Sequence, residues 1–268
     1  MKLRQGEIPR TNLDLVEETD YFMNFSSNDF IIPCLGERRI PSALTVNHFT
    51  PDEQRILFHN DLQRYLHDKG SEATPLSLEV AGPRKQIFFD PPKTKAAIVT
   101  CGGLCTGIND VIRSLVMELY HRYGVSNIIG IKYGFQGLIP SFGHQIVELT
   151  AEVVKDIHAD GGSMLSSSRG RQDIGEMVSA LKRMNIDIFF CIGGDGTMRA
   201  TECITQEINE RNLNISVIGI PKTIDNDLNL IDRTFGFDTA ISEAVKAIQC
   251  AHVEAKGAPM GIGALSKL

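Results

Sequence analysis

The sequence lacks the features that mark membrane, secreted and nucleic-acid-binding proteins. Its 268 residues contain no apolar run near the roughly 18 residues that span a membrane. The start, MKLRQGEIPRTNLDLVEETD, has no apolar signal core, and its acidic residues do not suit a transit peptide. Asp and Glu outnumber Lys and Arg by 33 to 27, so we expect no basic surface for nucleic acid or for a membrane. The sequence therefore favours a cytoplasmic protein with neither kind of partner.

Paired cysteines and the common nucleotide motifs are also missing. The six cysteines lie mostly inside apolar strand or helix patterns, as reduced cysteines of cytosolic proteins do. Cys101 and Cys105 could form half of a metal site, but no second pair with zinc spacing follows. The first glycine-rich segment has neither the GxGxxG spacing nor the Walker lysine. Any anionic ligand must therefore be held by backbone amides and a few local cations.

From Lys95 onward, short apolar segments alternate with amphipathic ones. Nearly all-apolar strands separated by amphipathic helices predict an α/β fold, with a parallel sheet and helices on both faces. Residues 1–93 have a mixed pattern, with an expected helix over 51–69 and a short strand over 85–89. We interpret them as an N-terminal extension that packs on the core or on another subunit. Residues 94–268 form the predicted α/β domain.

Three predicted strands are each followed directly by a polar segment. These segments are TCGGLCTGIND, CIGGDGTMRA and PKTIDND. Because ligands bind at the carboxyl ends of parallel strands, we expect the three to meet at one edge of the sheet. In the first, Gly102 and Gly103 allow close approach to the backbone, and the helix after Gly107 offers free amides. A tight strand–helix turn would explain these glycines equally well.

The second segment places one carboxylate among glycines. Gly193, Gly194 and Gly196 surround Asp195, and Thr197 begins a predicted helix. Such a loop can turn amides toward phosphate oxygens while the carboxylate holds a hydrated magnesium ion. The alternative is that Asp195 is a helix cap or a turn residue.

Cations come from GGSMLSSSRGRQD, where Arg169 and Arg171 precede a helix that we expect Asp173 to cap. A guanidinium group suits phosphate oxygens and developing phosphoryl charge. Two surface arginines in a loop are the alternative.

The third segment, PKTIDND, carries five polar side chains just after a strand. A kinase that acts on an alcohol needs a base for the hydroxyl proton and groups that position the reactants. Asp225 and Asp227 could divide these tasks, with Thr223 and Asn226 supplying neutral hydrogen bonds. An Asx-type turn that caps the next segment is the structural alternative.

Over residues 84–263 the chain resembles the ATP-dependent 6-phosphofructokinases. The resemblance rests on TKAAIVTCGGLCTGINDVIRS, GGSMLSSSRG, IGGDGT and GIPKTIDNDLNLIDRTFGFDTAISEA, and is closest to the branch with an N-terminal extension found in plants, trypanosomes and some bacteria. It implies a glycolytic phosphotransferase that moves the γ-phosphate of ATP to the 1-hydroxyl of D-fructose 6-phosphate. It also implies that residues 94–268 are the ATP-binding, Rossmann-like donor half of the fold. We expect a homo-oligomer when the enzyme is complete.

The resemblance also assigns residues. Asp225 would be the general base, with Thr223 and Asp227 beside it at the substrate and metal side, and Ile224 would join Thr223 and Asp225 in substrate binding. Asp195 would bind Mg²⁺, and Arg169 would act in catalysis as well as in ATP binding. The expected ATP contacts are Gly103, Arg169, Gly170, Gly194, Asp195, Gly196 and Thr197.

Donor choice depends on two positions. Pyrophosphate users in the family tend to carry aspartate at the position of Gly196 and lysine at that of Lys222. Here the lysine is present and the acid is not. We expect ATP as donor, because an acid at position 196 would occupy and repel the α-phosphate.

Several departures from the family pattern are visible. Thr106 replaces a proline, Ala200 replaces a glycine, and the closing segment MGIGALSKL ends before the family residues that grip the sugar phosphate. The sequence suggests a chain truncated before the sugar-binding second domain. One alternative function is therefore a non-catalytic chain that binds nucleotide or a partner. Another is a NAD or lipid kinase, which shares the GGDGT loop but is not expected to carry PKTIDND with FGFDTA.

Overall fold

The structure, a computed structural model, describes residues 30–46, 48–58, 61–63, 65–66, 75–228 and 231–257. The segment MGIGALSKL lies outside the described residues, as does the extension before Phe30. Two compact units divide the chain: Met1–Cys34 with Val46–Lys85, and Leu35–Thr45 with Gln86–Leu268. None of the helices in the described ranges has the length and hydropathy that crossing a bilayer requires.

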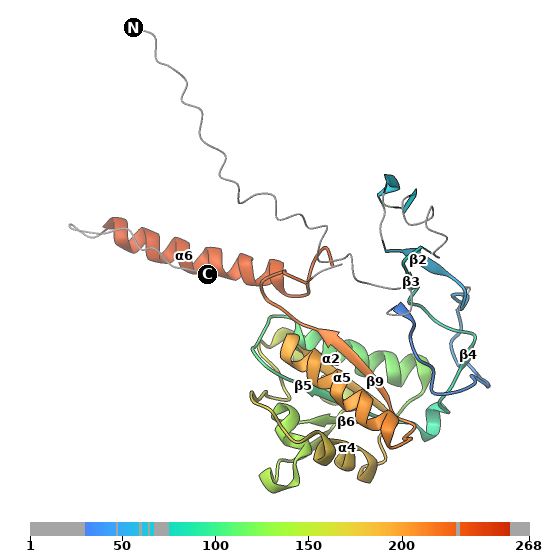
Figure 1. Ribbon diagram of the computed structural model, residues 1–268. Coiled ribbons are helices and arrows are strands. Elements are labelled where there is room, and N and C mark those ends of the chain that lie inside the picture. Colours follow the sequence, from blue (N-terminus) through green and yellow to red (C-terminus); the bar gives the residue numbers. More distant parts are fainter. Residues whose placement is uncertain are drawn as a thin grey trace. The chain divides into compact units, whose positions relative to one another are not determined.

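The larger unit is built on a five-stranded sheet with the order β7-β6-β5-β8-β9 (Figure 1). Its strands are β5 (Lys95–Thr100), β6 (Asn127–Ile131), β7 (Ile146–Glu148), β8 (Ile188–Gly193) and β9 (Ser216–Pro221). The pairs β6–β5, β5–β8 and β8–β9 are parallel, as predicted. Strand β7 pairs antiparallel with β6, and the sequence analysis missed this short edge strand.

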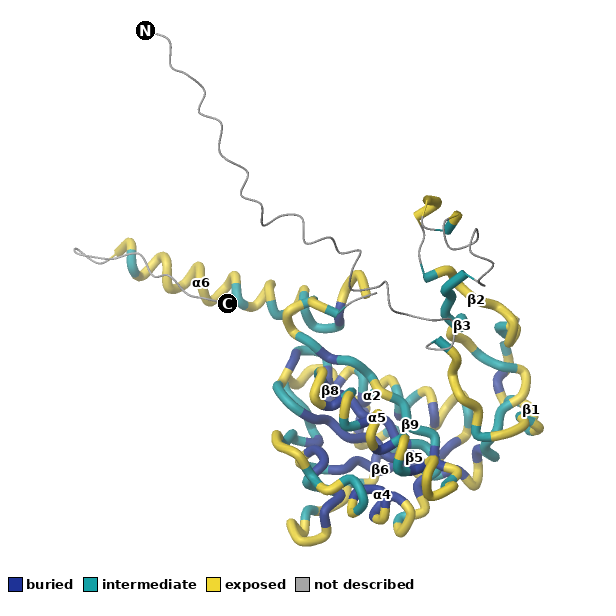
Figure 2. The backbone as a smooth tube through the Cα atoms, in the orientation of Figure 1, coloured by how far each residue is buried: buried dark blue, intermediate teal, exposed yellow. Residues whose placement is uncertain are grey.

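Helices cover both faces of this sheet, which confirms the predicted layers. Alternate residues of β5 point to opposite faces, because side chains alternate along a strand. Ala97 and Val99 pack with α4 (Ile174–Arg183) and α5 (Asp195–Glu210), whereas Ala96 and Ile98 pack with α2 (Ile108–Met117). In Figure 2, most of β5, β6 and β8 has the dark blue of buried residues, whereas β9 is mostly intermediate.

The larger unit also contains shorter elements. They are the antiparallel pair β1 (Ile40–Pro41) and β4 (Gln86–Ile87), the π-helical η3 (Glu118–Tyr123) that extends α2, and the 3₁₀ turns η2 (Pro91–Lys93), η4 (Gly134–Leu138) and η5 (Pro140–Phe142). The segment TAEVVKDIHAD forms two short pieces, α3 (Ala151–Val154) and the 3₁₀ turn η6 (Ile157–Ala159). The last described helix is α6 (Phe237–Gly257), in which no described residue is buried.

The smaller unit corrects one prediction. Residues 55–57, placed in a helix over 51–69, form strand β2 (Arg55–Leu57), which pairs antiparallel with β3 (Ser77–Glu79). Only the described residues 62, 63, 65 and 66 of that range are helical. Here, hydrogen bonds between the strands outweigh the local helix propensity. The Arg55 side chain donates to the Ser77 hydroxyl at 2.8 Å and to the Ser77 carbonyl at 2.5 Å.

Candidate active site

The three polar segments begin side by side at one edge of the sheet. They leave β5, β8 and β9, which are neighbours in the sheet and run parallel. The ladder continues one residue past the strand ends: the Cys101 amide donates to the Ile192 carbonyl at 2.8 Å, and the Lys222 amide donates to the Gly193 carbonyl at 2.9 Å. The predicted convergence is therefore confirmed.

A fourth segment, Ser163–Arg169, is bonded to the loop after β5. The Thr100 hydroxyl donates to the Ser166 carbonyl at 2.7 Å, and the Ser167 hydroxyl donates to the Gly102 carbonyl at 2.6 Å. A methyl group added at Gly103 would lie 3.6 Å from Nη2 of Arg169. Gly103 and Arg169, predicted as two ATP contacts, thus lie close together, and these hydrogen bonds between their segments do not involve the Arg169 side chain.

Asn109 organises the same region, and the sequence analysis did not single it out. Its buried side chain donates to the Asp160 carbonyl at 3.0 Å and accepts from the Met164 amide at 2.9 Å. This amide therefore ties the chain before Arg169 to the first turn of α2. The available signal was an amide side chain on the apolar face of an amphipathic helix.

The GGDGT loop forms the start of α5. Gly194 is the N-cap residue and no side chain caps the helix, so the interpretation of Asp195 as a helix cap is wrong. Asp195 lies exposed in the first helical turn, where the helix dipole favours a negative charge. Its carboxylate has no hydrogen-bond or ion-pair partner among the described residues.

The glycines of this loop differ in the space around them. A methyl group at Gly193 would lie 2.3 Å from the hydroxyl oxygen of the buried Thr197, so only glycine fits there. Nothing lies within 4 Å of a methyl group added at Gly196. The loop is therefore packed tightly beneath Gly193 and open at Gly196.

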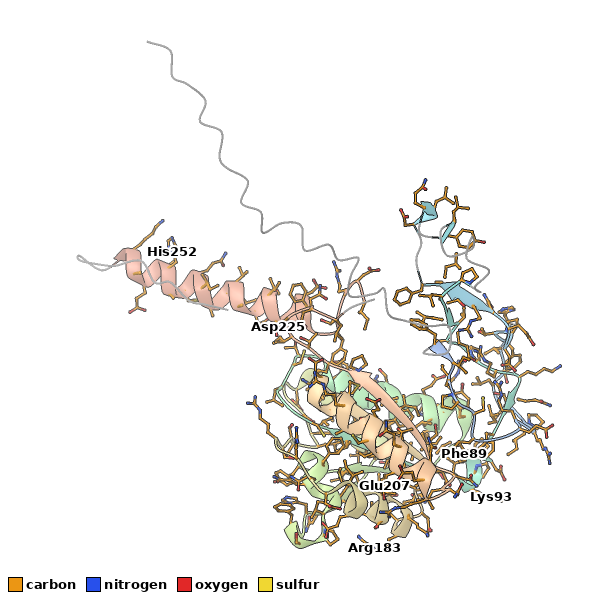
Figure 3. All side chains as sticks on the ribbon, in the orientation of Figure 1. Phe89, Lys93, Arg183, Glu207, Asp225 and His252 are labelled. Carbon is orange, nitrogen blue, oxygen red and sulfur yellow. The ribbon has the colours of Figure 1, made fainter. Side chains whose placement is uncertain are left out.

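In the loop after β9, some polar groups form hydrogen bonds within the protein and others are exposed to solvent. The Asp225 amide donates to the Thr223 hydroxyl at 3.0 Å. Asn226 has φ 55°, accepts from the Thr234 amide at 2.7 Å and donates to the Asp232 carbonyl at 3.4 Å. The turn interpretation thus holds for Asn226, whereas the side chains of Asp225 (labelled in Figure 3) and Asp227 are exposed.

Two buried groups lie behind these loops. The Cys105 thiol donates to the Phe235 carbonyl at 3.4 Å and to the Thr223 carbonyl at 3.7 Å, so it links the β5 loop to the residues around Asp225. Burial raises the pKa of Cys105; the nearby Lys222 charge opposes this rise and Asp225 adds to it. Lys222 is only 7% exposed, and its ammonium group has no ion-pair partner within the described part of the chain.

Thr106, which stands where the family has proline, also bonds across the site. Its hydroxyl donates to the Gly236 carbonyl at 2.5 Å, directly before α6. Proline could not form this bond, because it carries no side-chain donor. The threonine therefore ties the β5 loop to the start of α6.

A cavity of about 1060 Å³ opens between α2 and the first turns of α6. Its lining includes the acids Asp110, Glu118, Asp160 and Glu243, and none of the residues predicted to contact the donor. Like-charge repulsion makes this cavity a poor place for a polyphosphate. The converging loops, rather than this cavity, are the candidate site.

Comparisons with known proteins agree with this geometry. The family model described as Phosphofructokinase matches residues 95–261. The chain is 50% identical over 248 residues to the ATP-dependent 6-phosphofructokinase of Entamoeba histolytica, covering 92% of this chain and 57% of that protein. It is 47% identical over 242 residues to the protein of the same name from Borreliella burgdorferi, covering 88% of this chain and 54% of that protein.

Solved structures show the same fold. The pyrophosphate-dependent phosphofructokinase of Marinobacter aquaeolei aligns with a TM-score of 0.54 and 19% identity, over 61% of this chain and 42% of that one. The phosphofructokinase of Saccharomyces cerevisiae aligns with a TM-score of 0.53 and 25% identity, over 61% of this chain and 25% of that one. The chain spans about half the length of the curated relatives that it matches. With the family model covering most of the α/β unit, and with the converging loops where the motifs predict them, the chain belongs to the phosphofructokinase family.

Proposed function

We propose that this chain carries the donor side of an ATP-dependent 6-phosphofructokinase, which transfers the γ-phosphate of ATP to the 1-hydroxyl of fructose 6-phosphate. One observation carries the proposal: an open glycine loop, exposed carboxylates and a guanidinium group lie on loops at one sheet edge. The names of the relatives support the same activity.

The donor phosphates would lie over the start of α5. Free amides of its first turn and the space at Gly196 suit phosphate oxygens, and Arg169 beside Gly103 would add a positive charge. The remaining expected donor contacts are Gly170, Gly194 and Thr197.

Asp195 fits the expected Mg²⁺, because it is an exposed carboxylate without a partner among the residues that the structure describes. The described residues contain no group of three or more His, Cys, Asp and Glu side chains that could hold a metal ion. Mg²⁺ commonly binds through one or two carboxylates together with waters and substrate phosphates, so Asp195 alone is compatible with it. The ion would supply shielding of phosphate charge.

Asp225 is the proposed general base. Its carboxylate is exposed, and its amide is fixed by the Thr223 hydroxyl, so the backbone holds this side chain at the edge of the site. A positioned base contributes roughly 10²–10⁴ in rate. Thr223, Ile224 and Asp227 would complete the acceptor side around it.

We propose ATP rather than pyrophosphate as the donor. The open space at Gly196 leaves room for the α-phosphate, which an aspartate would both fill and repel. Lys222 is buried behind the loop, and its charge is compatible with either donor. Because Gly196 is the position with a steric consequence, it decides the assignment.

The wider setting is also part of the proposal. We place the N-terminal extension at residues 1–93 and the donor domain at 94–268, in a cytoplasmic protein that forms a homo-oligomer when complete. Since the chain covers only 54% and 57% of these two relatives, the sugar clamp would come from a second part of the protein. A second candidate function, nucleotide binding without turnover, is favoured by this same difference in length.

The test is a coupled assay for fructose 1,6-bisphosphate on this chain and on a version joined to the carboxyl-terminal half of a relative. This chain alone should show little or no turnover, because transfer depends on positioning both reactants. The joined version should turn over ATP and fructose 6-phosphate, with Asp225→Asn as its inactive control. Turnover by this chain alone would refute the need for a second half. A folded joined protein that binds Mg-ATP without turnover would favour the non-catalytic function.

A further inference from the structure

Hydroxyl side chains join two of the loops at the candidate site. The Thr100 hydroxyl donates to the Ser166 carbonyl at 2.7 Å, and its oxygen lies 2.8 Å from the Ser163 hydroxyl oxygen. Because Thr100 has one hydroxyl proton and a carbonyl can only accept, Ser163 is the donor in that second pair. Ser163 in turn accepts from the Leu165 amide at 3.2 Å. The end of β5 is thereby bonded to the segment that leads to Arg169.

A second link lies at Gly102, in the turn that follows β5. The Ser167 hydroxyl donates to the Gly102 carbonyl at 2.6 Å, and the Gly102 amide donates to the Ser168 carbonyl at 3.2 Å. Gly102 has φ 81°, and these two bonds hold its peptide groups on both sides. We call Thr100, Ser163 and Ser167, whose side chains make these links, the hydroxyl cluster.

The hydroxyl cluster stabilises an uncommon backbone conformation. Ser166 has φ 58°, in the left-handed region that residues other than Gly, Asn and Asp rarely adopt. Its carbonyl accepts from Thr100, and its amide donates to the Ser163 carbonyl at 3.0 Å. Such conformations persist where the surrounding structure determines them, and they are frequent at active sites. The bend at Ser166, shortly before Arg169, therefore depends on the buried Thr100.

The Arg169 side chain has little else to hold it. It is exposed, and its guanidinium group has no ion-pair partner among the residues that the structure describes. The next residue, Gly170, has φ 101°, so no regular element continues from Arg169. A methyl group at Gly103 would lie 3.6 Å from Nη2 of Arg169. The place of the guanidinium group beside Gly103 is therefore set by the backbone that the hydroxyl cluster holds.

We propose that Ser167 and Thr100 are positioning residues for the donor phosphates and that they act through Arg169. The inference rests on the proposed function, in which Arg169 contacts those phosphates. Recognition of phosphate by a guanidinium group depends on the direction of its N–H groups as well as on its charge, so a small backbone displacement weakens binding. Removal of a cluster hydroxyl should therefore matter only while the guanidinium group is present.

The test is a double-mutant cycle on the full chain, with Mg-ATP affinity measured by isothermal titration. Arg169→Ala should weaken Mg-ATP binding by about 10- to 100-fold, as expected for loss of a hydrogen bond to a charged group. Ser167→Ala and Thr100→Val should each weaken it by about 2- to 10-fold. Added to Arg169→Ala, neither should cause a further loss. Ser167→Thr keeps the hydroxyl and should retain wild-type affinity.

Two other serines supply matched controls. The Ser168 hydroxyl has no hydrogen-bond partner in the described part of the chain, so Ser168→Ala removes the same atom one residue on and should leave Mg-ATP affinity unchanged. The Ser179 hydroxyl donates to the Gly175 carbonyl at 2.7 Å and accepts from Arg211 at 2.9 Å. Ser179→Ala therefore breaks comparable bonds on α4, and should lower stability in urea without changing Mg-ATP affinity.

The outcomes separate this inference from the proposed function. Equal losses with and without the Arg169 side chain would overturn the positioning role, as would unchanged affinity in Ser167→Ala and Thr100→Val beside a weakened Arg169→Ala. Wild type that bound no Mg-ATP, or Arg169→Ala with wild-type affinity, would refute the proposed donor contact and the positioning role with it. Circular dichroism checks that each variant is folded; if the buried Thr100→Val is not, the half-buried Ser167→Ala decides alone.

Discussion

Gly193→Ala should damage the GGDGT loop, whereas Gly196→Ala, three residues on, should leave the fold intact. At Gly193 the new methyl would lie 2.3 Å from Oγ1, 2.6 Å from Cβ and 2.8 Å from Cγ2 of Thr197. Ordinary contact begins at 3.4 Å, so the closest pair must separate by about 1 Å (3.4 − 2.3). Thr197 is 6% exposed and its β-branched side chain has few alternative rotamers, so it cannot move aside freely.

The expected cost of Gly193→Ala is that of overpacking a core, about 1–3 kcal/mol. Gly196→Ala meets no atom within 4 Å and lies inside α5, so it should be neutral or stabilise by up to about 1 kcal/mol. Urea unfolding followed by circular dichroism measures both variants. A Gly193→Ala variant as stable as wild type, or a Gly196→Ala variant that is equally destabilised, would refute the packing argument for this loop.

Three further predictions concern single carboxylates and one thiol. Asp225→Asn in the joined enzyme should lower kcat by about a hundredfold or more, with Mg-ATP affinity nearly unchanged, and normal turnover would reassign the base to Asp227. Asp195→Ala should remove the magnesium dependence of ATP binding while urea stability stays near that of wild type, since the exposed side chain fills no core; unchanged titration with Mg-ATP would contradict the metal role. Burial raises the pKa of the Cys101 thiol from 9.0 to about 12 in the folded protein. Above pH 9 this thiol therefore ionises in the unfolded chain before it does so in the folded one, and the free energy of unfolding should fall as the pH rises toward 12. The fall should be less steep in Cys101→Ala, and equal slopes for the two proteins would contradict the burial effect.

Local patterns were enough to predict the sheet and the edge where the site lies. Four strands of the sheet are short apolar runs bounded by polar or glycine residues, and each helix between them repeats its apolar residues at helical spacing. Since parallel strands share an edge, the order of loops along the chain already implied that Gly103, Asp195 and Asp225 would meet. The Asp173 cap was also readable, because its side chain accepts from the Glu176 amide three residues later.

What the sequence could not predict depends on contacts between distant residues. Strand β2 exists because Arg55 and its neighbours pair with Ser77–Glu79, although the surrounding residues repeat at helical spacing. The links from Cys105 to Phe235 and from Thr106 to Gly236 join positions 130 residues apart. The ring contacts of His144 with Tyr133 and Phe142 also need a tertiary arrangement, since no local pattern predicts them.

Two arginines away from the candidate site are paired with carboxylates. Arg84 contacts Asp52 at 3.1 Å and Glu79 at 2.9 Å, and Arg211 contacts Glu207 at 2.6 Å.

At the sheet edge, the described structure gives no ion-pair partner to the buried Lys222 or to Asp195 and Asp225. A lysine that is only 7% exposed and has no carboxylate partner is not an arrangement that a fold needs to hold its sheet together. A ligand with both a divalent cation and phosphate oxygens would offset both signs of charge at once. Mg-ATP should therefore raise the unfolding temperature of this chain more than either Mg²⁺ or ATP alone, because only the complex satisfies the cations and the carboxylates together.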